Sequence, residues 1–271
     1  MDSKKSVGVK TFWYTDMLVM PKLVTIVTTI NGDGIVNAAP YSLGTPYNVV
    51  QKKPQMLLGM RKASHSCKNV IETKEFVINL PSWELMDEVM TTAQAFPKGE
   101  NELLHTNLTS IPSMKVKPPS IKECSQHIEC RLENIIELEA GMAFVIGNIV
   151  DIVVDEGLIA LGRNERIRAI DPPIYLGDEK RKYFYFGNVG ETRMIELKQP
   201  NKVKNSRAIT KMPWDEEALQ VIAKLPAGIV EMVIELVEDE AQKNGLNEIS
   251  YDFYKGIEEQ YAPKDVQERF D

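Results

Sequence analysis

Residues 22–42 read KLVTIVTTINGDGIVNAAPYS, and this stretch decides the fold of the first part of the chain. Two apolar runs, 22–30 and 35–42, flank Asn31-Gly32-Asp33-Gly34. Asn-Gly and Asp-Gly between apolar runs are the strongest short-range signal for a tight hairpin turn. The β-branched residues of the first run favour a pleated strand. The stretch therefore predicts two antiparallel strands joined by this turn.

Short apolar or alternating runs recur beyond the hairpin, and they predict strands at 55–60, 75–80, 128–132, 143–154 and 182–186. The alternation slips at Asn134-Ile135, which indicates a β-bulge. Two predicted helices, 64–74 and 83–95, and a proline-rich loop over 97–119 interrupt the strands. Many strands with few long helices predict a mainly β fold closed into a barrel, because closure removes exposed strand edges.

The pattern changes to helices near the C-terminus. Apolar residues recur at helical spacing over 215–224 and from Ile229 to a predicted cap at Gly245, and a third helix starts at Ser250. We predict a barrel domain over 1–200, a linker over 201–212 and a small all-α domain over 213–271.

Charge divides the chain at the same place. Residues 211–271 carry 6 basic and 15 acidic side chains, whereas the first 210 residues carry 26 basic and 24 acidic ones. The acidic end argues against nucleic acid as a partner, and the near-neutral first part suits an anionic ligand. No run approaches the roughly 20 apolar residues of a membrane span, and the charged N-terminus lacks the apolar stretch of a signal peptide. We therefore expect a cytoplasmic protein with no membrane partner.

Cys124, His127 and Cys130 form a Cys-x-x-His-x-x-Cys run that has the spacing of a metal motif on a helix. The segment is predicted as a strand, however, where a spacing of three alternates between faces. A fourth ligand is also not evident, and structural zinc takes four. The interpretation is that these residues hold no metal.

The stretch Asn37 to Ser42 combines small residues with polar ends. Small side chains let a flat ring, such as that of a flavin, lie against the backbone, where the backbone amides can hydrogen-bond it. Binding pockets rely on a few well-placed polar groups of this kind. The alternative is a turn between strands that is packed by small residues, and composition alone favours this alternative. The residues that would contact such a ligand are Asn37, Ala38, Ala39, Pro40 and Ser42.

The stretch Arg61 to Asn69 offers cations, hydroxyls and a helix start capped by Ser64. Free amides at a helix N-terminus together with cations suit a phosphate, although a solvated helix cap explains the pattern equally well. Asn79 ends an apolar strand, where it either bonds a ligand or marks a turn. The candidate phosphate residues are Arg61, Lys62, Ser64, Ser66, Lys68 and Asn69.

Together these stretches resemble the flavin reductase-like, flavoredoxin-type FMN-binding split-barrel family. The resemblance rests on Val24-Thr25-Ile26-Val27-Thr28-Thr29, on the Asn37 to Ser42 run and on His65-Ser66-x-x-Asn69-Val70 with its continuation to Asn79. The run Pro97-x-Gly99-x-Asn101-Glu102 and the strand from 143 to 154 continue it. The match covers roughly residues 10 to 195.

The resemblance implies a Greek-key split barrel that forms a homodimer and holds FMN near the subunit interface. Residues 37–42 would border the isoalloxazine ring, the Arg61 to Asn69 residues would surround the phosphate, and Asn79 would lie near the ribityl chain. Tyr183 and Tyr185 belong to a late segment that often approaches the flavin in this family.

The C-terminal segment has its own resemblance, to the small helical domain at the C-terminus of a light-independent protochlorophyllide reductase subunit. It rests on Pro213-Trp214-Asp215, Leu225-Pro226 and Asn244-Gly245. In that domain basic residues follow the Leu-Pro step, whereas this chain has Glu231, Met232 and Ile234. A docking module is therefore the preferred interpretation.

Three functions follow as hypotheses. The first is an NAD(P)H-dependent flavin reductase, in which hydride passes to flavin and no catalytic side chain is required. The absence of a Gly-x-Gly-x-x-Gly run leaves no predicted Rossmann site, so the nicotinamide would stack on the flavin. The second is a flavoredoxin-like electron carrier reduced by a protein donor, and the third is a non-redox binding scaffold.

Overall fold

The computed structural model describes residues 18–49, 53–179, 182–193, 210–225 and 227–261, together with Lys4, Ser6, Gly8 and Val9. The chain divides into two compact units at Met194 and Ile195. We call the described residues up to 193 the barrel unit and residues 210–261 the helical unit. Residues 201–209 of the predicted linker lie outside the described residues, so the predicted domain limits stay a prediction.

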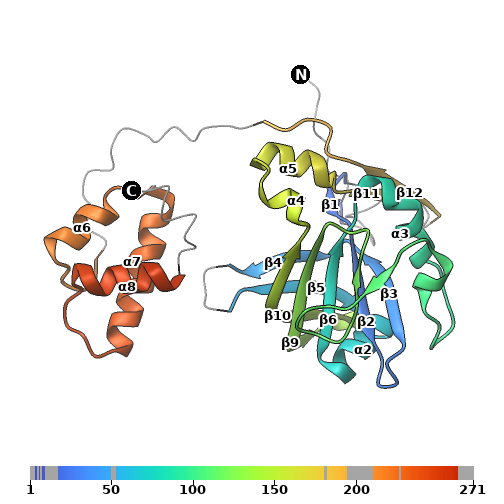
Figure 1. Cartoon of the computed structure of the whole chain (residues 1–271), viewed down its shortest axis with the longest axis horizontal. Coiled ribbons are helices and arrows are strands. Elements are labelled where there is room, and N and C mark those ends of the chain that lie inside the picture. The colour runs from blue at the N-terminus through green and yellow to red at the C-terminus, as the bar shows by residue number, and fades with distance from the viewer. Residues whose placement is uncertain are drawn as a thin grey trace. The chain divides into compact units, whose positions relative to one another are not determined.

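A seven-stranded antiparallel sheet forms the body of the barrel unit (Figure 1). Its strands lie in the order β3-β2-β6-β9-β10-β5-β4, so β3 and β4 are the two edge strands. The bounds are β2 (Thr25–Ile30), β3 (Val36–Tyr41), β4 (Gly44–Asn48), β5 (Gln55–Arg61), β6 (Glu75–Leu80), β9 (Gln126–Glu137) and β10 (Met142–Val154).

Smaller elements surround this sheet, with α2 at one end and α4 and α5 at the other (Figure 1). The short strands are β1 (Lys22–Leu23), β7 (Ser110–Ile111), β8 (Ser120–Ile121), β11 (Ile174–Glu179) and β12 (Tyr183–Gly187). The helices are α2 (His65–Thr73), η1 (Trp83–Leu85), α3 (Met86–Thr92), η2 (Glu102–His105), η3 (Glu139–Gly141), α4 (Glu156–Ile159) and α5 (Arg163–Ile170).

The predicted hairpin is confirmed as β2 and β3. The register places Thr29 opposite Asn37. The Asn31 side chain fixes the turn, because its Oδ1 accepts the N–H groups of Asp33 at 3.0 Å and Ile35 at 2.8 Å. Gly34 takes a φ of 80°, which only glycine adopts without strain.

The sheet separates two apolar clusters, because successive side chains of a strand face opposite ways. On β2, Val27 belongs to the cluster that also holds Phe76 and Val145. Its neighbour Ile26 belongs to the second cluster, with Leu103 and Tyr175. Both faces of the sheet are therefore buried. The sheet curls so that its own strands, together with α2, cover one face, and α3, η2 and β11 cover the other.

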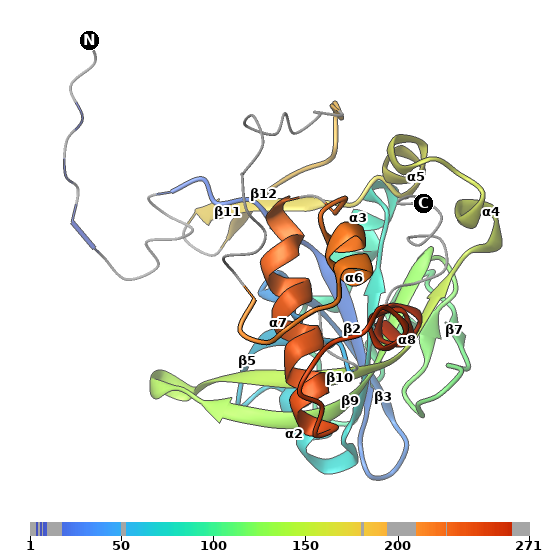
Figure 2. The ribbon, with the colours of Figure 1, turned by 90° about the vertical axis from the view of Figure 1, so that its left-hand side faces the viewer.

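β9 and β10 run side by side as the longest pair of the sheet (Figure 2). The register changes from Ile146 opposite Asn134 to Gly147 opposite Leu132, so Glu133 is the extra residue of a bulge. The predicted slip lay one residue later in the chain. Gly147 is buried where a Cβ atom would lie 2.4 Å from Cζ of Phe76.

The sequence analysis missed β4, β11, α4 and α5. The β4 sequence GTPYN is short, contains Pro46 and is mostly exposed, so it shows no alternating apolar pattern. The α5 sequence RNERIRAI is dominated by charge and buries only Ile170. Local periodicity is too weak in both segments to identify them.

The helical unit contains α6 (Glu216–Ile222), α7 (Ala227–Lys243) and α8 (Tyr251–Tyr261), as the periodicity predicts. Trp214, Ile234 and Ile249 belong to its own apolar cluster. Glu238 is buried inside this unit, and its Oε1 accepts the indole N–H of Trp214 at 3.1 Å as well as two backbone N–H groups. Among the described residues, no helix combines the length and the apolar character needed to cross a bilayer.

We predict that Gly147→Ala destabilises the barrel by about 1–3 kcal/mol, because the added methyl group overlaps Phe76 and forces the core to shift. Urea unfolding measures the change. Gly157→Ala on α4 is the matched control, since an added Cβ meets no described atom within 4 Å there. Equal stability of the two variants would contradict the close contact.

Candidate functional site

The structure brings the two predicted stretches together. Asn37 on β3 and Ser66 on α2 are both buried, and the Asn37 amide lies 3.0 Å from Ser66 Oγ. Asn69, one turn further along α2, donates from Nδ2 to Thr29 Oγ1 at 3.1 Å. The polar side chains predicted to face a ligand are therefore used in part to attach α2 to the hairpin.

Glu102, the first residue of η2, carries a carboxylate that packs against β3 and is 5% exposed. Its Oε2 accepts the Ala38 N–H at 2.9 Å. Its Oε1 lies 3.0 Å from the side-chain amide of Asn37, which also contacts Ser66. A continuous polar network thus joins η2, the edge strand β3 and the first turn of α2.

The network protects the outer edge of β3. β2 occupies one side of this strand, so the Ala38 N–H that reaches Glu102 points away from the sheet. Pro40, two residues on, has no N–H at all. An edge covered in this way resists pairing with a foreign strand. It also means that Ala38 and Pro40 contribute no amide donor to a ligand.

Electrostatics distinguish Glu102 from an ordinary surface carboxylate. Burial raises its pKa above the ordinary 4.5, and the Ala38 N–H and the charge on His65 offset part of the rise. Burial likewise raises the pKa of the Tyr41 phenol, while the hydroxyls of Ser66 and Ser64 act in the opposite direction. Both ionisable groups therefore favour their neutral forms more strongly than exposed side chains would.

The first turn of α2 has the features of an anion site. The Ser64 hydroxyl caps the helix by accepting the Cys67 N–H at 3.2 Å, and the Lys68 N–H makes the first intrahelical bond at 3.2 Å. The amides of His65 and Ser66 therefore precede the helical ladder, where an anion is favoured. A small cavity of about 40 Å³ adjoins this turn, lined by Asn31, Ile35, Val36, Asn37, His65, Lys68, Asn69, Lys98, Gly99 and Glu100.

The predicted cations differ in their availability. Arg61 and Lys68 are exposed, whereas Lys62 pairs with Glu137 at 2.7 Å and is partly exposed. An exposed ion pair of this kind contributes little to stability, so it leaves Lys62 able to exchange partners. Ala39, Pro40 and Ser42 are partly buried on or just after β3.

Asn79 lies within the sheet and is fully buried. Its Nδ2 donates to Ile26 O and Thr28 Oγ1, each at 3.1 Å, and its Oδ1 accepts the Ile121 N–H at 2.9 Å. The amide thereby fastens the segment that contains β8 onto β2. These bonds by themselves account for an asparagine at the end of an apolar strand, and the ribityl contact stays a prediction.

Other candidate residues lie apart from this network. Tyr183 and Tyr185 are exposed on β12, in the three-stranded sheet. Cys124 and Cys130 belong to the apolar clusters on opposite faces of the large sheet, and burial raises the pKa of both thiols. Among the described residues, no three His, Cys, Asp or Glu side chains gather as metal ligands.

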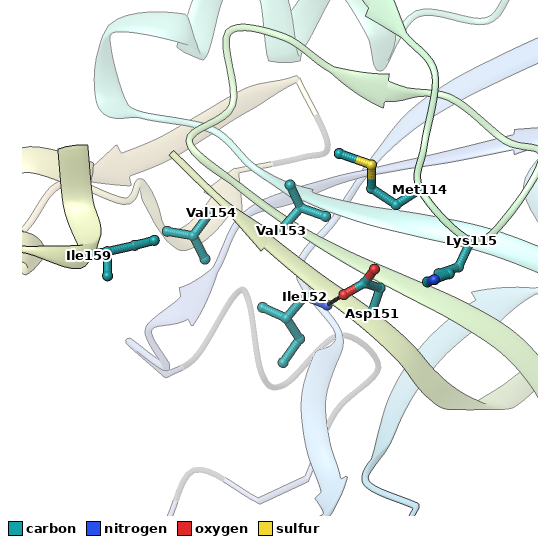
Figure 3. A pocket seen from close by; sticks show the side chains of 7 residues that line it. All are labelled: Met114, Lys115, Asp151, Ile152, Val153, Val154 and Ile159. Carbon is teal, nitrogen blue, oxygen red and sulfur yellow. Dashed lines mark hydrogen bonds between the residues drawn. The ribbon is translucent and has the colours of Figure 1, made fainter. Parts of the chain in front are cut away.

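A second hollow, about 550 Å³ in volume and open to solvent, lies elsewhere on the barrel unit. Figure 3 shows Met114 and Ile159 on either side of the residues at the end of β10. It shares no residue with the predicted ligand site, and its charged lining is limited to Lys115 and Asp151. We therefore place the candidate site at β3 and α2.

The barrel unit is thus a curled antiparallel sheet with small residues on one edge strand and a capped helix start beside it. The flavin reductase like domain matches residues 17–171 of this chain. The chain therefore belongs to the flavin reductase-like family. An uncharacterized protein of Methanothermobacter thermautotrophicus is 36% identical over 142 residues, which are 51% of this chain and 66% of that protein.

Solved structures share the fold at lower identity. Nitrilotriacetate monooxygenase component B from Bacillus cereus is 23% identical with a TM-score of 0.64, over 72% of this chain and 100% of that one. Flavoredoxin of Desulfovibrio vulgaris (Miyazaki F) is 24% identical with a TM-score of 0.59, over 71% and 97%. A split barrel domain protein from Shewanella frigidimarina is 23% identical with a TM-score of 0.56, over 66% and 87%. The predicted mainly β split barrel is thus confirmed.

Sequence reasoning missed Glu102 as a member of the site network. Glu102 lies in the Pro97 to Glu102 motif, but its partner Ala38 is 64 residues away in the chain. An acidic residue between Asn101 and Leu103 in a polar loop gave no local sign of burial.

We predict that Asn79→Ala lowers the free energy of unfolding by about 2–3 kcal/mol, because it leaves buried backbone groups without partners. FMN affinity of the folded variant should not change. Urea unfolding and FMN titration measure both effects, with the exposed Asn107→Ala as control. Loss of FMN affinity at full stability would restore the predicted ribityl contact.

We predict that Glu102→Gln flattens the pH dependence of stability of the ligand-free protein. Because the folded-state pKa of Glu102 is raised above 4.5, the native state holds its proton more tightly than the unfolded state. The free energy of unfolding of the native protein should therefore fall, relative to that of the variant, as the pH rises from 4.5 through the raised pKa. Denaturant unfolding at a series of pH values tests this, and parallel curves would refute it.

Proposed function

We propose that the barrel unit binds FMN and passes hydride from NAD(P)H to the flavin. Family membership over residues 17–171 is the single observation that carries this proposal. The arrangement at β3 and α2 supports it, because small residues border one side of the site and donors for a phosphate border the other.

The residues at the start of α2 fit a phosphate group. The amides of His65 and Ser66 precede the helical ladder, and Arg61 and Lys68 supply positive charge from exposed positions. Ser66 is the weaker part of the fit, since it is 1% exposed and its hydroxyl faces Asn37. We propose that its backbone, rather than its side chain, meets the phosphate.

The bound flavin would supply the hydride-accepting chemistry, and the protein would supply position and electrostatics. Glu102 and Asn37 hold β3 in place beside the ring position. Asn69 ties α2 to β2 through Thr29, which fixes the distance between the ring-bordering and phosphate-binding segments. We assign no acid–base side chain to hydride transfer.

A flavoredoxin-like electron carrier is the second candidate, favoured by the shared fold with Desulfovibrio flavoredoxin. It would hold FMN tightly and take electrons from a protein donor instead of NAD(P)H. Reduction by ferredoxin without reduction by NAD(P)H distinguishes this function from the first.

We also propose a cytoplasmic homodimer. Tyr183, Phe184 and Tyr185 are 54%, 44% and 53% exposed on consecutive positions of β12. Consecutive exposed aromatic residues on both faces of an edge strand are typical of a surface that another chain covers. The role of the helical unit, and its resemblance to the protochlorophyllide reductase segment, stay predictions.

We expect the purified protein to show an oxidised flavin spectrum and to release FMN in near-equal amount to chain. Arg61→Ala should weaken FMN binding about 10-fold while riboflavin binding stays the same, because a charge-assisted bond to phosphate is lost. Titration of each flavin measures this, and Lys122→Ala, an exposed cation elsewhere, is the control.

Steady-state oxidation of NADH and NADPH with flavin present then tests the reductase activity. Bound FMN without turnover would favour the electron carrier. A colourless protein that also fails to bind added FMN would overturn both redox functions and leave a scaffold.

A further inference from the structure

The cavity beside α2 is bounded by three segments that lie far apart in the chain. The β2–β3 turn and the start of α2 supply two of its walls, and the loop before η2 supplies the third, with Lys98, Gly99 and Glu100. Its volume is about 40 Å³, and one water needs about 10–15 Å³ of such space. The cavity therefore has room for about three waters, which is close to the size of one phosphate group.

Positive charge converges on this cavity from two sides. Lys68 on α2 and Lys98 on the loop both line it, and both side chains are exposed. Neither lysine has an ion pair within the described ranges of the chain. Glu100 also lines the cavity, but its Oε1 lies 2.6 Å from Nε2 of His105, which engages this carboxylate. Two ammonium groups beside one engaged carboxylate favour an anion as the ligand.

A buried side chain in the same cavity leaves a polar group for a ligand. Asn69 lines the cavity and is 8% exposed, and its Nδ2 donates to Thr29 Oγ1 at 3.1 Å. The other end of this amide has no hydrogen-bond partner among the described residues. Buried polar groups are normally satisfied, so we expect a polar group of a ligand to reach it. The hydroxyl beside the phosphate of a phosphorylated sugar alcohol can supply that partner.

A tight turn holds Lys98 in place. The Glu100 N–H donates to Pro97 O at 3.2 Å, and Gly99 takes a φ of 86° at the third residue of this turn. A positive φ at that position favours glycine. Two residues beyond the turn, the Glu102 carboxylate accepts a backbone N–H of β3 and ties the loop to the sheet. The backbone therefore fixes the place from which Lys98 reaches the cavity.

The same turn closes one end of the cavity against the hairpin. A Cβ atom added at Gly99 would lie 3.9 Å from Ile35 Cδ1, which is ordinary van der Waals contact. A terminal phosphate stays inside this boundary, whereas a group attached to the far side of the phosphate would have to part the two segments. The closed end therefore discriminates between a phosphate monoester and a longer diester.

We propose that Lys98 binds the phosphate of the proposed FMN site together with Lys68, and that the turn 97–100 makes this site select a flavin that ends in a phosphate monoester. FMN ends in this group, riboflavin lacks it, and in FAD the phosphate continues into a second phosphate and adenosine. This role of Lys98 rests on the proposed function, because it names the cation and the turn that choose FMN among the flavins.

Flavin titrations of the full chain, after removal of any bound flavin, test the role of Lys98. Lys98→Ala should weaken FMN binding about 10-fold and leave riboflavin binding unchanged, because one charge-assisted bond to the phosphate is lost. Lys98→Glu should weaken FMN binding further, because a like charge then faces the phosphate. Added salt should weaken FMN binding more in the native protein than in Lys98→Ala. Lys122→Ala, at an exposed position elsewhere, should change the affinity for neither flavin.

The same titration with FAD tests the closed end of the cavity. The native protein should bind FMN at least about 10-fold more tightly than FAD. Ile35→Ala should narrow this difference by raising the affinity for FAD, because it removes the side chain that meets Gly99. The FMN affinity of this variant should stay close to that of the native protein, since Ile35 offers no polar group to the phosphate.

The outcomes separate the role of Lys98 from the proposed function. FMN and riboflavin affinities that change equally in Lys98→Ala, or that do not change at all, would overturn the role of Lys98 and leave flavin binding standing. Equal affinity of the native protein for FMN and FAD would overturn the selection by the turn. Failure to bind any of the three flavins would overturn the proposed function itself.

Discussion

A buried hydrogen-bonding group must find a partner inside the protein. This constraint determines how the loops of the barrel unit attach to the sheet. A buried polar group without a partner costs more than the average hydrogen bond contributes. Asn79 meets this constraint by fastening the β8 segment to β2. Glu129 on β9 does the same for the preceding loop, since its carboxylate accepts the N–H groups of Met114 and Lys115. The segment from Met114 to Ile121 is thus attached near both of its ends by buried side chains from the sheet.

Glu102 reverses this arrangement, because here a loop supplies the side chain and the sheet supplies the backbone. The carboxylate covers the outward N–H of β3 at Ala38 and meets the amide of Asn37. The edge strand is therefore protected and positioned by one ionisable group. A neutral acceptor such as an amide oxygen could also accept the Ala38 N–H, so the carboxylate adds sensitivity to protons that the fold alone does not require.

In the helical unit, Oε1 of the buried Glu238 accepts three N–H groups, whereas its Oε2 has no hydrogen-bond partner among the described residues. The apolar cluster of this unit is separate from those of the barrel unit. Residues 211–271 carry a net charge of −9 (6 basic and 15 acidic side chains), whereas the first 210 residues carry a net charge of +2. A small unit with its own core and a strongly acidic surface is typical of a module that contacts another molecule, and this accords with a docking role.

The sequence by itself determined the hairpin at 22–42, helix α2 with its Ser64 cap, the strand-rich character of the first part and the helices of the last. These features follow from turn chemistry, capping and periodicity, which act between residues close in the chain. It also determined which stretches form the candidate site, because the local patterns around Asn37 and Ser66 single out both stretches.

Only the tertiary structure decided what those side chains contact. Asn79 bonds Ile121 and Ile26, and Glu102 reaches Ala38 across 64 residues. A hydrogen bond between segments distant in sequence leaves no periodic trace, because it depends on how the sheet folds back on itself.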